Sequence, residues 1–237
     1  EVLMDTDLKT TKTKYLVIAV LSFFITLSCW SFSSSIGSGG DIDAHISSIW
    51  CAWGEKPGIC ENDNDSTAQV PYMFQMCDGR PIDSWPNCEL AQTSETKQEL
   101  RIIREVQRSP YYSIMRVFAT TNPQQSILNM RMVNTLIASL ILFGLLKLTS
   151  GRTQVAAISA MTFTLVPVAI MRIPSINPQG WATLGVMTSW AFLHGFLNTP
   201  KSDKNKKWLL AFFIFSVLLP ATTRVDSTTY VVFTSAI

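Results

Sequence analysis

Apolar and polar positions alternate along the chain in long blocks, and this pattern predicts several membrane-crossing helices. The hydrocarbon core of a bilayer is about 30 Å thick, so a helix needs roughly 20 apolar residues to cross it. The apolar run that begins at Tyr15 meets this length. Shorter apolar runs follow at residues 132–149, 153–172, 181–197 and 208–223, and a sixth starts near Thr228. Pro167 and Pro220 lie within two of these runs and are expected to kink them.

The long segment between the first two runs, residues 36–131, is mostly polar. Residues 41–53 predict a helix that lies on the membrane surface. Ile46, Ile49, Trp50 and Trp53 recur there at helical spacing, with both tryptophans on one face.

The rest of this segment divides in two. Residues 54–90 are rich in turn-forming residues and predict a loop without a core of its own. Residues 94–107 predict a second helix, because Glu95 and Glu99 favour its first turns.

The composition supports a membrane protein. Of the 237 residues, 47% are hydrophobic and only 15% are charged, which is too apolar for an ordinary soluble domain. The net charge is +2 and no basic stretch is interleaved with aromatics, so we expect no nucleic-acid partner. The chain starts at Glu1 and stops inside an apolar run, so we expect a longer polypeptide with further spans.

Lysine and arginine are distributed unevenly around the predicted spans, which suggests an orientation. With a cytoplasmic N-terminus, the short outside loops hold only Arg172 and Arg224. The inside segments then hold Lys9, Lys12, Lys14, Lys147, Arg152, Lys201, Lys204, Lys206 and Lys207. We therefore expect a multi-pass plasma-membrane protein in three parts: residues 1–35 with the N-terminus and first span, an extracytoplasmic loop at 36–131, and a membrane bundle at 132–237.

Cysteines agree with this orientation. The outer segment holds an even number of them, which predicts two disulfides in an oxidising compartment: Cys51, Cys60, Cys77 and Cys88. Three pairings are open, and we favour Cys51–Cys60 with Cys77–Cys88 because neighbours close small loops. Zinc is the alternative, but the spacing lacks a close CxxC pair. Cys29, in the first span, is expected to be an apolar filler.

Polar residues gather near the predicted outer membrane face. They are Asp41, Asp43, His45, Arg131, Arg172, Asn177, Arg224 and Asp226. If the helices bundle, these groups could share one cavity, where a carboxylate deprotonates an acceptor hydroxyl and arginine holds a phosphate. Most of these residues also have a simpler interpretation. Asp41 would be a helix cap, Asp43 a water-facing residue of the first turn, and His45 an interfacial histidine with its hydrogen bonds satisfied. Arg172 and Arg224 would reach lipid headgroups, and the "NPQG" sequence would be a turn.

The chain resembles the domain-of-unknown-function family 2142, bacterial multi-pass membrane proteins related to the GT-C glycosyltransferase fold. The family's acidic motif with a histidine, which follows the first span, is matched by "DIDAH", where Asp41 and His45 align and Asp43 offers a second carboxylate. Further matches are Arg131 in "LNMRMVN", the Asn-Pro turn in "PSINPQG", and Arg224 in "PATTRVD".

The resemblance implies an all-α, GT-C-like multi-span bundle with surface-lying helices in a disulfide-bearing first outer loop. It also implies a glycosyltransferase that moves a sugar from a polyprenyl-phosphate donor to an envelope glycan or lipid acceptor. Asp41 or Asp43 would act as the base with His45 assisting, and Arg131, Arg172 and Arg224 would hold the donor phosphate. No cofactor is assigned, and a divalent metal is left open. The alternative is a non-enzymatic membrane subunit or export partner in envelope polysaccharide assembly; ion-coupled transport is disfavoured because the later spans carry few ionisable residues at mid-depth.

Overall fold

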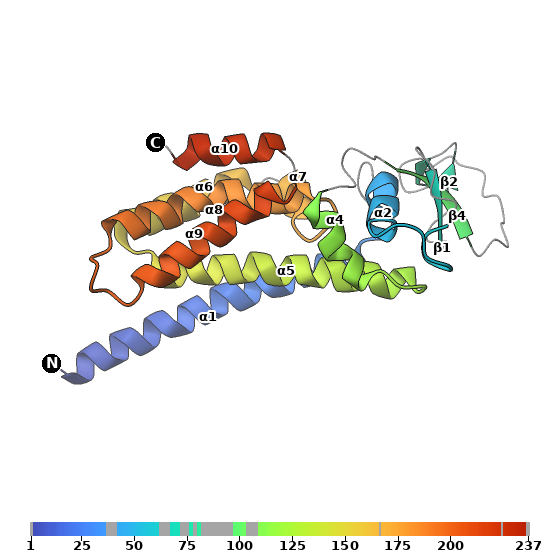
Figure 1. Ribbon diagram of the computed structural model, residues 1–237. Helices are drawn as coiled ribbons and strands as arrows, with labels where there is room; N and C mark the ends of the chain where they lie inside the picture. Colours follow the sequence, from blue (N-terminus) through green and yellow to red (C-terminus); the bar gives the residue numbers. More distant parts are fainter. Residues whose placement is uncertain are drawn as a thin grey trace.

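The computed structural model is mostly helical, with its long helices side by side and a small mixed unit at one end (Figure 1). It describes the backbone of residues 2–36, 42–61, 67–71, 76–77, 80–81, 97–102, 109–165, 167–223 and 225–235. Within these ranges, the side chains of residues 2–12 and a few others are not described.

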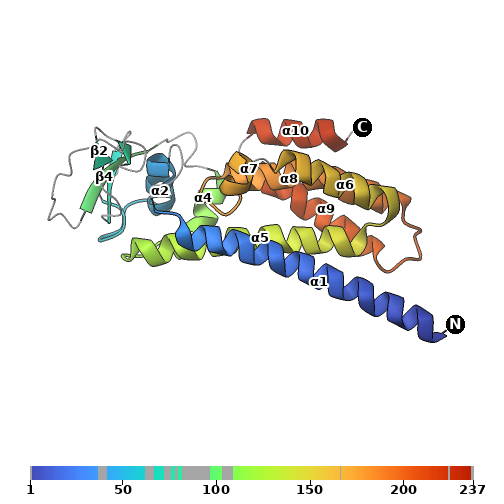
Figure 2. The ribbon, with the colours of Figure 1, turned by 180° about the vertical axis from the view of Figure 1, so that it is seen from behind.

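Helix α1 (Val2–Ser33) packs along α5 (Pro123–Leu148). Its N-terminal end points away from the other helices (Figures 1 and 2). In the described part of the chain, two helices are long and apolar enough to cross a membrane: Thr13–Ser33 within α1, and α5. The first two predicted spans are therefore present as long apolar helices.

The later helices complete the bundle. Helix α8 is its centre, because it packs against α5, α6, α7, α9 and α10. The bounds are Gly151–Thr164 for α6, Pro167–Arg172 for α7, Gln179–Asn198 for α8, Lys206–Ala221 for α9 and Val225–Ser235 for α10.

Helix boundaries differ from the predicted spans where local chemistry overrides hydrophobicity. Helix α5 starts at Pro123, well before residue 132, because the Asn122 side chain accepts a hydrogen bond from the Gln125 amide and proline suits the first turn. The third predicted span is two helices, since α6 ends at Thr164 and α7 begins at Pro167. This break is where Pro167 was expected to kink the span.

The mixed unit contains helices and short strands. They are α2 (Ile42–Trp50), β1 (Thr67–Pro71), β2 (Met76–Cys77), β3 (Arg80–Pro81), β4 (Lys97–Arg101), α4 (Pro110–Met115) and the 3₁₀ helix η2 (Arg116–Phe118). Strand β1 pairs antiparallel with β4, and β2 pairs with β3.

The helix predicted at residues 94–107 is wrong in the part of it that the structure describes, residues 97–102. Strand β4 occupies residues 97–101, with Arg101 opposite Thr67 in β1. Lys97 and Glu99 are exposed while Leu100 is buried, which is the two-residue alternation of a half-buried strand. Pairing with β1 overrides the helical preference of this lysine- and glutamate-rich sequence.

Part of the predicted loop at residues 54–90 is strand β1, and its buried residues join the hydrophobic core that runs through the rest of the molecule. Ile46, Ile49 and Trp50 of α2 are fully buried in the same hydrophobic cluster as Val70 and Leu100. Trp50 donates its indole N–H to the Thr120 carbonyl at 3.2 Å. The helix predicted to lie on the membrane surface therefore has Trp50 buried in the protein, so the prediction is wrong for this residue.

Cys51 and Cys60 form a disulfide, with Cα atoms 5.3 Å apart. It ties the end of α2 to the chain leading into β1 and matches the first of the two favoured pairings. Cys88 lies outside the described residues and the Cys77 side chain is not described, so their pairing stays a prediction.

Candidate functional site

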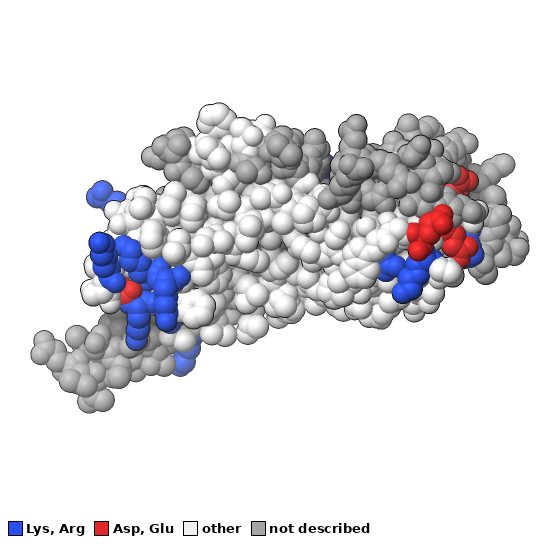
Figure 3. Space-filling view, viewed as in Figure 1, with Lys and Arg blue, Asp and Glu red and all other residues white. Residues whose placement is uncertain are grey.

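The two ends of the bundle differ in their charges. Figure 3 shows lysine and arginine side chains gathered at the end far from the mixed unit. The described basic residues at the helix ends and turns on that side are Lys14, Lys147, Arg152, Lys201, Lys204, Lys206 and Lys207. The opposite end, where α2 and α4 meet the bundle, holds the described residues of the predicted site.

His45 connects α2 to α4 within the mixed unit. Its Nδ1 atom lies 2.8 Å from the Tyr112 hydroxyl, and the two rings stack with centroids 6.0 Å apart. His45 is half-buried on α2, whereas Tyr112 on α4 is fully buried. This part of "DIDAH" is thus packed against α4 rather than directed into open solvent.

The structure does not describe the two carboxylate side chains of that motif. Asp41 lies outside the described residues, and the Asp43 side chain is not described, although its backbone belongs to α2. Among the described side chains, no three His, Cys, Asp or Glu gather as metal ligands. A metal site at "DIDAH" therefore stays a prediction.

Aromatic contacts extend inward from His45. Tyr111 meets both Tyr112 and Trp181 edge to face, with ring centroids 5.5 and 4.9 Å apart. Burial raises the pKa of the Tyr111 phenol, which keeps it neutral. The tyrosine pair of α4 thereby joins α2 to α8.

Asn134 closes this network inside the bundle. Its Oδ1 accepts the Trp181 indole N–H at 2.8 Å, and its Nδ2 donates to the Ser175 carbonyl at 2.5 Å. One buried amide thus fixes α5, α8 and the segment before α8 relative to each other. We call the residues His45, Tyr112, Tyr111, Trp181 and Asn134 the outer network.

Arg131 lies beside this network, but its contacts are structural. Its guanidinium donates to the carbonyls of Ser31, Ser34 and Ser35 at 3.1, 2.7 and 2.7 Å. These carbonyls lie at and just beyond the C-terminus of α1, where a helix has unpaired acceptors and favours a cation. Arg131 thus holds α1 on α5. A donor phosphate, the ligand predicted for Arg131, would have to replace hydrogen bonds that its guanidinium already makes to three carbonyls.

Arg172 and Asn177 lie at the corner between α7 and α8. Arg172 is exposed and its guanidinium donates to the Gln179 side chain. The Asn177 side chain accepts a hydrogen bond from the Gln179 amide at 2.9 Å. Both residues therefore shape the turn that begins α8, as in the simpler interpretation of "NPQG".

The corner itself requires a glycine. A Cβ atom on Gly180 would lie 2.6 Å from the Arg172 carbonyl oxygen. Only the absence of a side chain lets the end of α7 approach α8 this closely.

Arg224 lies outside the described residues, and the Asp226 side chain is not described. The chain just before them meets α4. The Thr222 carbonyl accepts hydrogen bonds from the Tyr111 amide at 3.1 Å and from the Ser109 hydroxyl. The end of α9 is thus attached to the tyrosine pair that binds His45.

The structure brings His45 and the end of α9 to the same tyrosine pair. The two described arginines instead donate hydrogen bonds to other groups of the protein: Arg131 to serine carbonyls at the end of α1, and Arg172 to the Gln179 side chain. Sequence reasoning missed Tyr111, Tyr112, Asn134 and Trp181. The sequence did carry a signal for Asn134. In a membrane protein, a polar amide within an apolar run is expected to bind a polar partner on another helix. No local pattern distinguished the two tyrosines from surface residues.

Comparison with protein-family models matches residues 23–237 to a family described as "Predicted membrane protein (DUF2142)". No curated protein and no solved structure matches the chain.

Proposed function

Since the chain belongs to the DUF2142 family of predicted membrane proteins, we propose that it is a membrane glycosyltransferase. In this proposal the outer end of the bundle transfers a sugar from a polyprenyl-phosphate donor to an envelope glycan or lipid. The observation that carries it is the attachment of α2, the helix of "DIDAH", to α4 through the His45–Tyr112 hydrogen bond. That bond joins α2 to the α4 tyrosines, which also hold the end of α9, two residues before Arg224.

The proposed orientation has the basic end of the bundle in the cytoplasm and the mixed unit outside. It rests on the accumulation of lysine at one end (Figure 3) and on the tendency of cytoplasmic loops to carry Lys and Arg. A disulfide in the mixed unit suits an oxidising outer compartment.

The roles within the site follow from chemistry. Asp41 or Asp43 acts as the base that takes the proton from the acceptor hydroxyl as that oxygen attacks the anomeric carbon. The bond from that carbon to the donor phosphate breaks, and the departing phosphate keeps the electron pair. Arg224, with Arg172, stabilises that developing charge, and Asp226 orients the arginine. Arg131 is assigned a positioning role, because it anchors α1 directly before the motif.

Sugar transfer by the purified chain in lipid nanodiscs tests the proposal, with a panel of radiolabelled polyprenyl-phosphate sugars and mixed envelope acceptors. We expect Asp41→Asn or Asp43→Asn to lower turnover at least 100-fold, the scale of a lost general base. Asp203→Asn is the matched control, since Asp203 is exposed in the turn before α9 at the other end. Full turnover by both motif variants would refute the assigned chemistry.

The second candidate is a non-enzymatic subunit of an envelope assembly. Exposed apolar side chains on the mixed unit favour it: Trp53, Ile114 and Val117 are 60%, 43% and 64% exposed. If no donor of the panel reacts and Trp53→Ala with Val117→Ser abolishes co-purification of a partner, this candidate replaces the enzyme.

A further inference from the structure

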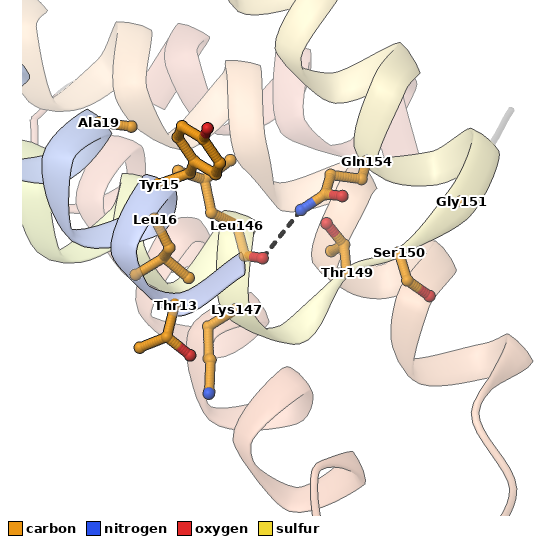
Figure 4. A pocket seen from close by; sticks show the side chains of 10 residues that line it. All are labelled: Thr13, Tyr15, Leu16, Ala19, Leu146, Lys147, Thr149, Ser150, Gly151 and Gln154. Atoms are coloured by element: carbon orange, nitrogen blue, oxygen red, sulfur yellow. Dashed lines mark hydrogen bonds between the residues drawn. The ribbon is translucent and has the colours of Figure 1, made fainter. Parts of the chain in front are cut away.

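A cavity of about 650 Å³ lies at the basic end of the bundle, far from the outer network (Figure 4). One wall comes from the start of the apolar part of α1, with Tyr15, Leu16 and Ala19. The other wall comes from the corner between α5 and α6. The residues of that corner are Leu146, Lys147, Thr149, Ser150, Gly151 and Gln154.

The depth of this cavity is fixed by the two apolar helices that enclose it. Its α1 residues begin the candidate span Thr13–Ser33, and its α5 residues end the candidate span Pro123–Leu148. A site at the ends of two spans lies at the level of lipid headgroups rather than in the hydrocarbon core or in bulk water.

The cavity's polar groups could bind a ligand. The side chains of Lys147, Ser150 and Tyr15 have no hydrogen-bond or ion-pair partner among the residues that the structure describes. By contrast, the Gln154 side chain is bound to the Leu146 carbonyl, the dashed line in Figure 4. The Lys147 ammonium is a donor suited to a phosphate, and Figure 4 shows it directed away from the Tyr15 hydroxyl on the other side of the cavity.

The charge around the cavity is positive. Lys14 and Arg152 neighbour it in sequence, and the lysines of the α8–α9 turn lie at the same end of the bundle (Figure 3). Asp203 is the acidic residue described in that turn. Such a concentration of lysine attracts anionic lipid to this end of the bundle.

We propose that this cavity binds one anionic phospholipid, with its phosphate at Lys147 and an acyl chain along Leu16, Ala19 and Leu146. Those apolar walls favour a lipid over a free anion, because a soluble phosphate gains nothing from them. The bound lipid fills the space between α1 and the α5–α6 corner and stabilises α1 where it diverges from the bundle.

Native mass spectrometry of the purified full chain in detergent tests this, with phosphatidylglycerol, phosphatidylcholine and glycerol 3-phosphate as separate additions. We expect one phosphatidylglycerol to be retained in preference to phosphatidylcholine. Lys147→Gln should lower its affinity about fivefold, and Ala19→Trp should lower it by filling the apolar wall. Lys204→Gln, an exposed lysine outside the cavity, is the matched control and should change the affinity less than twofold.

Three results would overturn the proposal. Equal losses in Lys147→Gln and Lys204→Gln would mean diffuse surface charge without a site. Equal retention of phosphatidylcholine would remove the selectivity for an anionic headgroup. Displacement of the lipid by glycerol 3-phosphate would identify a free anion as the ligand.

Discussion

The two ends of the helix bundle use polar residues in opposite ways. At the end beside the mixed unit, called the outer end after the proposed orientation, Arg131 and Asn134 are buried. Each is bound to specific partners on other segments. At the basic end, Lys201, Lys204 and Lys207 are exposed around a solvent-facing turn.

This difference separates two physical effects. A buried polar group contributes through a few directed hydrogen bonds, and its removal leaves partners unsatisfied. An exposed charge contributes little to folding but acts at a distance on lipids and on membrane orientation. We therefore expect substitutions at the outer end to change stability, and substitutions at the basic end to change lipid binding and orientation.

Arg131→Met gives the largest expected effect. It leaves the Ser31, Ser34 and Ser35 carbonyls without their donor, and we expect the free energy of unfolding to fall by about 3 kcal/mol. Thermal unfolding in detergent measures this, with Lys147→Met on the same helix as the control. Equal stability losses in the two variants would erase the distinction between the ends.

The paired change Cys51→Ser with Cys60→Ser comes next. The disulfide closes a short loop with a sequence separation of 9, and we expect its loss to cost about 2–3 kcal/mol through the entropy of the unfolded chain. Mild reduction of the native protein should lower the unfolding temperature to a similar extent. A native unfolding temperature in the double variant would show that packing alone holds α2.

Asn134→Leu tests the centre of the outer network. The change leaves the Trp181 indole N–H and the Ser175 carbonyl without partners, and we expect a loss of about 1–2 kcal/mol. Limited proteolysis near residues 173–178 should increase alongside. Asn198→Leu, at the exposed end of α8, is the control, and a larger loss there would contradict the argument.

Joint replacement of the exposed Lys201, Lys204 and Lys207 by Gln gives the smallest expected change in stability. Exposed charges contribute less than about 0.5 kcal/mol each, so the unfolding temperature should shift little. Orientation should suffer instead, because these lysines supply much of the basic bias. Labelling of an introduced surface cysteine from each side of the membrane measures the fraction inserted the wrong way, and an unchanged fraction would contradict the proposed orientation.

Sequence reasoning succeeded where one local property dominates. The apolar run from Tyr15 and the break at Pro167 both follow from the chain itself, through hydrophobic length and ring geometry. It failed at residues 94–107, where partnership with β1 decided the conformation. The Cys51–Cys60 disulfide lay between these cases. Its short separation in the sequence favoured it, but the other two ways of pairing the four cysteines stayed open.

The candidate site divides in the same manner. Residue types and their order pointed to His45 and the arginines, but the sequence could not tell a phosphate ligand from a structural arginine. Arg131 shows why: its carbonyl partners lie about a hundred positions away, and only the packing of α1 on α5 brings them within reach.

By itself, the sequence determined that the chain is an apolar, helix-forming membrane protein with basic residues on one side, because hydrophobic length and charge are additive along a chain. Tertiary structure alone decided which polar groups are bound to which, and which remain available to a ligand. Hydrogen bonds and burial depend on neighbours that are distant in sequence, and folding alone sets those neighbours.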